Sequence, residues 1–144
     1  MEPVTLIGRA VIPGQTQGIA LVSHEPLSFW GGYDWQTGEI IDRRHELSGM
    51  NARGKILALP FTRGSSTTTA VLLEAIRAGT APAAIITTDT DFFFALASVV
   101  ADELYAASLP LIALDAPGFS QLKTGDIITV LSEGKIMIRP GGPV

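Results

Sequence analysis

Five consecutive residues, Arg63 to Thr67, carry side chains and backbone freedom suited to binding an anion or moving a proton. Gly64 permits a tight turn, and the hydroxyls of Ser65, Ser66 and Thr67 can cap a helix, because their oxygens accept hydrogen bonds from its first unpaired N–H groups. A helix N-terminus favours negative charge, and Arg63 adds a guanidinium whose planar fork fits carboxylate or phosphate. The stretch is therefore either an active site or an ordinary helix cap, and the local pattern leaves both open.

Two common motifs are excluded for this stretch. No lysine follows Gly64 in the pattern of a phosphate-binding P-loop. Ser65 also lacks the flanking glycines of a G-x-S-x-G nucleophile elbow. Any chemistry here must therefore use a serine activated in another way.

The surrounding elements place the stretch between a strand and a helix. Residues 55–59 form an apolar strand candidate, and apolar residues at helical spacing predict a helix from about Ser66 to Ala78. A strand at 83–86, a helix at 92–107 and a strand at 111–114 follow. Strands joined through helices pair in parallel with right-handed crossovers, so the middle of the chain predicts a parallel sheet.

The two ends of the chain predict antiparallel strands. Val4 to Val11 reads as one strand that forms a hairpin with 19–22, and 38–42 as a short strand. Residues 127–131 and 135–139 predict a hairpin around Glu133 and Gly134. We expect these strands to form a second layer on the other face of the parallel sheet, which gives an α/β fold.

A second dense region is Ser28-Phe29-Trp30-Gly31-Gly32, followed by Tyr33 and Trp35, which holds both tryptophans of the chain. One interpretation is a loop that folds its own aromatic rings onto the core. The other is a loop that walls a pocket or meets a partner. The sequence favours neither.

Other polar residues have a structural interpretation beside a functional one. Asp89 and Asp91 precede the second helix, where capping is favoured over a place in a site at the end of the preceding strand. His24 and His45 lack a second ligand at metal-binding spacing, so each is expected to be solvated or hydrogen-bonded for structural reasons. The run Phe92 to Phe94 is typical of a core or an interface.

Composition narrows the class of protein. The 144 residues predict a single domain spanning 1–144, and the absence of cysteine removes thiolate nucleophiles and cysteine ligands from this chain. The net charge of −4 argues against nucleic-acid binding, and no apolar run is long enough for a membrane helix. A cytoplasmic location is expected. Mean hydropathy of +0.34 is high for a small monomer, which indicates a very aliphatic core or a surface covered by another chain.

From about Val4 to its end the chain resembles the aconitase X swivel-domain family. The combination of Ser28-Phe-Trp-Gly-Gly with Arg63-Gly-Ser-Ser at this spacing carries the resemblance, together with Ile40-Ile-Asp and Ala81-Pro-Ala-Ala-Ile. The resemblance implies a swivelling three-layer β/β/α domain. It also implies a large partner subunit, or a large fused part, that carries iron or an iron–sulfur cluster, with none bound by this chain.

The resemblance further implies a hydro-lyase that dehydrates a small hydroxy acid, with Ser65 as the base that removes the proton. The substrate-binding residues would come from both motifs: Ser28, Phe29, Trp30, Gly31, Gly32, Arg63, Gly64, Ser66 and Thr67. Aconitase has an arginine two residues after the matching serine, where this chain has Thr67. The binding of a substrate carboxylate therefore cannot be transferred from aconitase.

Members of this family dehydrate cis-3-hydroxy-L-proline or mevalonate 5-phosphate. The second helix, ending in Asp102-Glu-Leu-Tyr before Pro110, looks more like the bacterial hydroxyproline form. A phosphate substrate would ask for more cations than Arg43, Arg44 and Arg63. The alternative from another class is a non-catalytic swivelling subunit that only docks.

Overall fold

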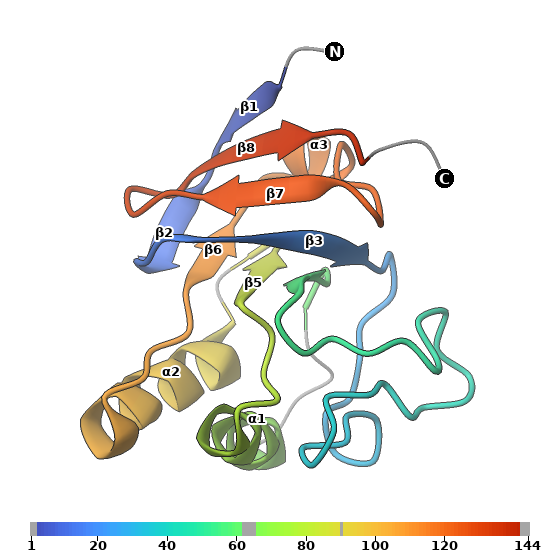
Figure 1. Cartoon of the computed structure of the whole chain (residues 1–144), viewed down its shortest axis with the longest axis vertical. Coiled ribbons are helices and arrows are strands. Elements are labelled where there is room, and N and C mark those ends of the chain that lie inside the picture. The colour runs from blue at the N-terminus through green and yellow to red at the C-terminus, as the bar shows by residue number, and fades with distance from the viewer. Residues whose placement is uncertain (1–2, 62–65, 90, 142–144) are drawn as a thin grey trace.

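The computed structural model describes residues 3–61, 66–89 and 91–141. A parallel block forms its middle, in which each strand lies beside the next one along the chain (Figure 1). Two helices connect these strands and pack against each other on one face. The elements of this block are β3 (Thr16–Val22), β4 (Ile56–Ala58), α1 (Ser66–Ala78), β5 (Ala84–Thr87), α2 (Phe92–Tyr105) and β6 (Leu111–Ala113).

The other strands extend the same sheet in antiparallel fashion. The full order is β1-β8-β7-β3-β4-β5-β6-β2, so β3 belongs to both halves and the two end strands, β1 and β2, are consecutive in the chain. The antiparallel half folds over the face of the parallel half that lies away from the helices (Figure 1). The additional elements are β1 (Val4–Ile7), β2 (Arg9–Ile12), the short helix α3 (Ala116–Phe119), β7 (Ile127–Val130) and β8 (Lys135–Arg139).

Alternation along the parallel strands divides the apolar interior into two cores. Leu21, Leu57, Ile85 and Leu111 point toward the helices and the long loop after β3. Their neighbours Ala20, Ile56, Ala84 and Ile112 point the other way, toward the antiparallel strands. The predicted three-layer α/β arrangement is therefore confirmed, with the parallel strands buried on both faces.

The prediction of one strand from Val4 to Val11 was wrong. The segment divides at Gly8, where β1 pairs with β8 and β2 pairs with β6, and neither forms a hairpin with β3. A Cβ at Gly8 would lie 2.6 Å from Ile112 Cγ2 and 3.0 Å from the Gly134 carbonyl oxygen. The backbone of Gly8 is thus packed against β6 and the β7–β8 turn, contacts that a local pattern does not reveal.

Smaller corrections concern element ends. Residues 38–42 contribute only isolated bridges, Tyr33 with Ile40 and Glu39 with Asn51, instead of a strand. The second helix ends at Tyr105, two residues before its predicted end, because Ala106 adopts a left-handed conformation. The short helix α3 was not predicted. The terminal hairpin of β7 and β8 is confirmed.

Candidate active site

The carboxyl ends of β4 and β5 bring the chain to the predicted catalytic turn. Past the strand ends, the Leu59 N–H donates to the Ile86 carbonyl at 2.9 Å, and the Thr88 N–H donates to the Pro60 carbonyl at 3.1 Å. The Thr88 hydroxyl donates to that same carbonyl at 2.8 Å. These bonds fix the chain up to Phe61 at the edge of the sheet where parallel α/β folds bind their ligands.

Arg63, Gly64 and Ser65 lie outside the described residues. Ser66 is the first residue of α1, and Thr67, in its first turn, is exposed. The next residue, Thr68, is buried. The predicted start of a helix at about Ser66 is thus confirmed, and Ser65 immediately precedes α1 in the sequence.

The N-terminus of α2 lies beside that of α1. The Thr69 hydroxyl in the first turn of α1 donates to the carbonyl of Phe93 in the first turn of α2 at 3.0 Å. Asp91 caps α2, with its carboxylate accepting from the N–H groups of Phe93 and Phe94 at 3.0 and 3.2 Å. The capping interpretation is therefore confirmed for Asp91. Two helix N-termini side by side strengthen the positive potential at this edge.

The aromatic loop after β3 divides its rings between the core and the surface. Phe29 is fully buried, stacks on Tyr33 with ring centroids 4.8 Å apart, and meets Phe94 of α2 edge-on at 5.2 Å. Trp30 is 72% exposed and Gly31 is exposed, whereas Gly32 is buried. The Ser28 hydroxyl donates to the Trp30 carbonyl at 3.2 Å. The interpretation of a loop that folds aromatic rings onto the core is confirmed for Phe29 and Tyr33, and a role of Trp30 toward a ligand or partner stays a prediction.

A surface hollow lies between this loop and α1. Trp30, Gly31, Tyr33 and Trp35 line one side of it, and Val71 of α1 belongs to its opposite wall. Burial raises the pKa of the Tyr33 hydroxyl, which donates to the Thr80 carbonyl at 2.8 Å. The ring of Phe29 acts as the anchor of this loop, so the residues available to a ligand or partner are Trp30 and Gly31.

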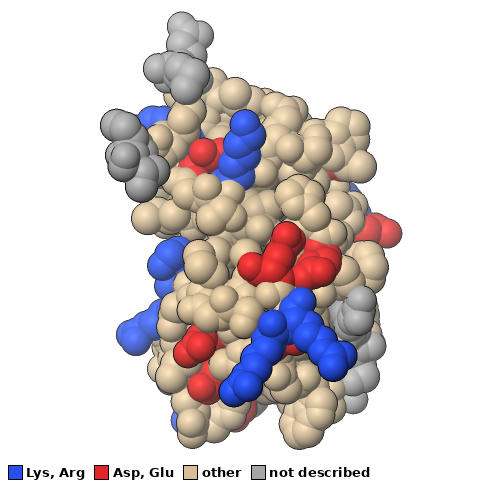
Figure 2. All heavy atoms as spheres, turned by 90° about the vertical axis from the view of Figure 1, so that its right-hand side faces the viewer, with Lys and Arg blue, Asp and Glu red and all other residues tan. Residues whose placement is uncertain are grey.

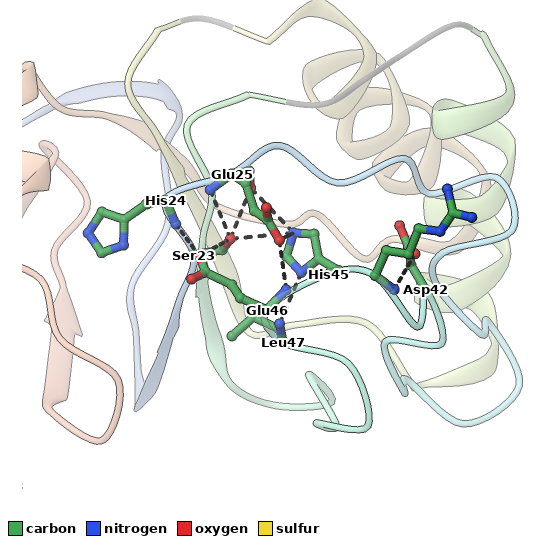
Figure 3. Close-up of polar contacts among 8 residues, drawn as sticks. Ser23, His24, Glu25, Asp42, His45, Glu46 and Leu47 are labelled. Atoms are coloured by element: carbon green, nitrogen blue, oxygen red, sulfur yellow. Dashed lines mark hydrogen bonds and ion pairs between the residues drawn. The ribbon is translucent and has the colours of Figure 1, made fainter.

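A hydrogen-bonded cluster fixes the same loop to the end of β3 (Figure 3). The buried Ser23 hydroxyl lies 2.6 Å from the Glu46 carboxylate and 3.4 Å from His45 Nε2. The Leu47 N–H donates to His45 Nδ1 at 3.1 Å, so in this arrangement the proton sits on Nε2, which faces the Glu25 carbonyl at 3.3 Å. His45 is thus hydrogen-bonded for structural reasons, as the sequence predicted.

Hydrogen bonds within the cluster favour the charged form of Glu46. Hydrogen bonds from the Ser23 hydroxyl and the His24 N–H lower the pKa of the Glu46 carboxyl below its ordinary value. On the face of the molecule that carries the long loop, basic and acidic side chains are intermixed, and the acidic group at its centre lies directly beside basic side chains (Figure 2).

Sequence reasoning missed a polar cavity at the carboxyl end of β5 and β6. Arg9 from β2, Thr88 and Asp115 line it, and the Thr88 hydroxyl also donates to the carbonyl of Pro60, shortly before the predicted catalytic turn. Asp115 caps α3 by accepting from the Gly118 N–H at 2.8 Å. The sequence signal that could have pointed to this cavity is Arg9, the one charged residue in the strand segment from Val4 to Ile12.

Comparison with known proteins gives the family. The family model of the aconitase X swivel domain matches residues 5–138. The chain belongs to the aconitase X swivel-domain family. Its structure resembles that of aconitase X (holo-form) from Thermococcus kodakaraensis with a TM-score of 0.83 and 31% identity, covering 94% of this chain and 98% of that one. The swivel fold implied by the sequence is thereby confirmed.

Curated relatives of this aconitase X swivel domain are named dehydratases. The cis-3-hydroxy-L-proline dehydratase of Pseudomonas aeruginosa is 45% identical over 109 residues, which are 76% of this chain but only 19% of that relative. The phosphomevalonate dehydratase small subunit of Methanosarcina acetivorans is 34% identical over 145 residues, covering 99% of this chain and 96% of the relative. The domain thus occurs both inside a much longer chain and as a small subunit.

The donor set of this swivel domain does not fit an iron–sulfur cluster or a metal ion of its own. The sequence has no cysteine, and the described residues contain no group of three or more His, Asp or Glu side chains that could hold a metal. Within residues 3–61, 66–89 and 91–141, no helix has the length and apolarity needed to cross a membrane.

Proposed function

We propose that this chain is the small subunit of an aconitase X-type hydro-lyase that dehydrates cis-3-hydroxy-L-proline to 1-pyrroline-2-carboxylate. The observation that carries the proposal is the meeting of the α1 and α2 N-termini, joined by the bond from Thr69 to Phe93, because the Arg63-Gly-Ser-Ser stretch leads into α1 in the sequence. A large partner subunit completes the enzyme and carries the iron or the iron–sulfur cluster, which would supply a Lewis acid for the leaving hydroxyl.

In this proposal Ser65 removes the proton from the carbon next to the leaving group. A free serine hydroxyl is too weak a base for this step, so the protein must stabilise the alkoxide. The N–H groups at the start of α1, the dipoles of α1 and α2, and the Arg63 guanidinium are the available means. Trp30 and Gly31, with Ser28 behind them, would cover the substrate from the side of the aromatic loop.

The identity of 45% to the bacterial hydroxyproline enzyme supports this substrate. The alternative is mevalonate 5-phosphate, favoured by the full-length match to an archaeal small subunit. A phosphate ester would need additional cations at the site. Arg9 is a described cation on this side of the sheet, where it lines a cavity together with Thr88.

The test is to purify the native complex through a tag on this chain and assay both substrates side by side. Turnover of cis-3-hydroxy-L-proline with little turnover of mevalonate 5-phosphate is the expected result. The reverse preference would reject the hydroxyproline assignment and retain the hydro-lyase. A complex that contains the large subunit but is inactive on both would leave the substrate assignment without support.

Ser65→Ala tests the role of the base. Loss of a general base typically lowers turnover by roughly 10²- to 10⁴-fold, while the complex should still assemble. Ser66→Ala is the matched control, because it removes a neighbouring hydroxyl and should cost far less. Near-normal turnover of Ser65→Ala would instead support a subunit that only docks.

A further inference from the structure

Helix α2 is apolar on two opposite faces. Phe92, Leu96 and Val99 are 66%, 38% and 51% exposed. An α-helix turns by about 100° about its axis per residue, so these three side chains point within about 60° of one another, and Glu103 falls in the same range. We call Phe92, Leu96 and Val99 the α2 stripe. The residues buried against the sheet and the loop lie on the other side of the helix: Phe94, Ala97, Ser98 and Ala101.

The end of α2 is acidic, where a helix favours positive charge. Asp102 and Glu103, here called the acidic pair, are exposed in its last turn, which has no basic residue. The ion pairs found among the described residues involve neither of them. The pair is therefore unfavourable for the isolated helix.

A helix that is apolar all round is normally buried on all sides. Figure 1 shows α2 at one side of the helix layer, with α1 as its only helical neighbour in that layer. We infer that the α2 stripe docks into an apolar groove of the large subunit, and that basic side chains of that subunit meet the acidic pair. This inference rests on the proposed function, because it takes its partner from there.

Three observations favour the large subunit over a second copy of this chain. In the bacterial relative the matched residues are 19% of a single chain, so most of that chain lies outside the match and is available to cover the swivel domain. Helix α2 contains no lysine or arginine, so α2 packed on the α2 of another copy would offer the acidic pair no cation from that helix. The stripe also starts at Phe92, beside the edge that must face the partner's metal site.

Mass spectrometry of the native complex, purified through a tag on this chain, first identifies the large subunit. Two double variants of the full chain are then each co-expressed with that subunit and compared with the wild type. Leu96→Glu with Val99→Glu places charge in the middle of the stripe. Met137→Glu with Ile19→Glu is the matched control, because these side chains are 37% and 49% exposed on the antiparallel strands. Thermal melts of both purified variants establish that they are folded.

The stripe variant should lose at least 10-fold in affinity for the large subunit, and the control should bind like the wild type. Equal binding by all three chains would overturn the docking site and leave the proposed function standing. A wild-type chain that retains no large subunit would overturn both. A wild-type homodimer that only the stripe variant dissociates would show that the occupant is a second copy, against the inference.

Charge reversal of the acidic pair gives a second readout that a purely structural role would not produce. Asp102→Lys with Glu103→Lys should raise the melting temperature of the chain alone, because cations suit a helix C-terminus. The same variant should bind the large subunit more weakly, and the loss should shrink as salt is added. Higher stability with unchanged binding would overturn the proposed charge contact.

Discussion

Helices α1 and α2 pack side by side on the same sheet, yet they expose different kinds of side chains to solvent. The exposed side of α1 carries small or charged residues, Ala70, Glu74 and Arg77, and ends in an ion pair between Glu74 and Arg77 at 2.8 Å. The exposed side of α2 carries the α2 stripe, and its last turn carries the acidic pair. Helix α1 is thus suited to water, and α2 to a protein surface.

The ends of the two helices differ in the same way. α1 is followed by Gly79 with φ of 77°, where glycine adopts the left-handed conformation at little cost. α2 is followed by Ala106 with φ of 53°, the only non-glycine residue with positive φ in the described part of the chain. Sequences usually break such local rules where function requires it, and the inferred docking of α2 on the large subunit would be such a requirement.

The largest expected change in stability comes from the buried face of α2, and a substitution on its exposed face should cost far less. Phe94→Ala should destabilise the chain by ~3–5 kcal/mol, because it empties a buried site packed against Phe29. Phe92→Ala should change the free energy of unfolding by less than about 0.5 kcal/mol, since this side chain is exposed. Urea unfolding measures both, and similar losses would show that the α2 stripe already packs within this chain.

The cap of α2 has the next largest effect. Asp91→Ala should cost about 1–2 kcal/mol, because the N–H groups of Phe93 and Phe94 lose their acceptor. Asp91→Asn keeps an acceptor oxygen and serves as the control in the same unfolding assay. If Asn costs as much as Ala, the charge of Asp91 matters beyond capping.

Substitutions at the residues that follow the two helices, Gly79 and Ala106, test whether the C-terminal end of α2 is less stable than it could be. Gly79→Ala should destabilise by roughly 1 kcal/mol, because alanine is strained at positive φ. Ala106→Gly should stabilise by a few tenths to about 1 kcal/mol for the converse reason. A loss of stability in Ala106→Gly would remove this part of the contrast between the helices.

The surface ion pair of α1 should contribute least. Glu74→Gln should lower the free energy of unfolding by about 0.2–0.5 kcal/mol, the usual value for an exposed pair on one helix. The difference should decline in high salt, which unfolding curves at two ionic strengths can check. A large, salt-independent loss would point to a packing role for Glu74.

The sequence predicted the parallel block well, because each of its strands is a short apolar run bounded by turn residues and each helix has a clear periodic face. It could not predict the division at Gly8, which depends on Ile112 and Gly134, residues more than a hundred positions away. Phe29 and Trp30 are neighbours of the same chemical kind, and only the packing of Tyr33 and Phe94 decides that one is buried and the other exposed.

In the candidate site too, features set by neighbouring residues could be predicted from the sequence, and features set by contacts between distant residues could not. Asp91 as a cap follows from its position before an apolar helix. The cluster of Ser23, His45 and Glu46 joins residues more than twenty positions apart, and its chemistry depends on burial that no local pattern contains. The contribution of Arg9 to the site edge likewise arises from the pairing of β2 with β6. Ser65 stays a prediction of sequence and family.

The division at Gly8 also has a consequence for biosynthesis. β1 and β2 are synthesised before the strands they pair with, because β2 pairs with β6 and β1 pairs with β8, which follows every other described strand in the sequence. Closure of the sheet is therefore expected only after β8 has left the ribosome, and until β1 and β2 pair, the edges of β6 and β8 present unpaired backbone to other nascent chains. Deleting the first twelve residues would make that aggregation-prone stage permanent.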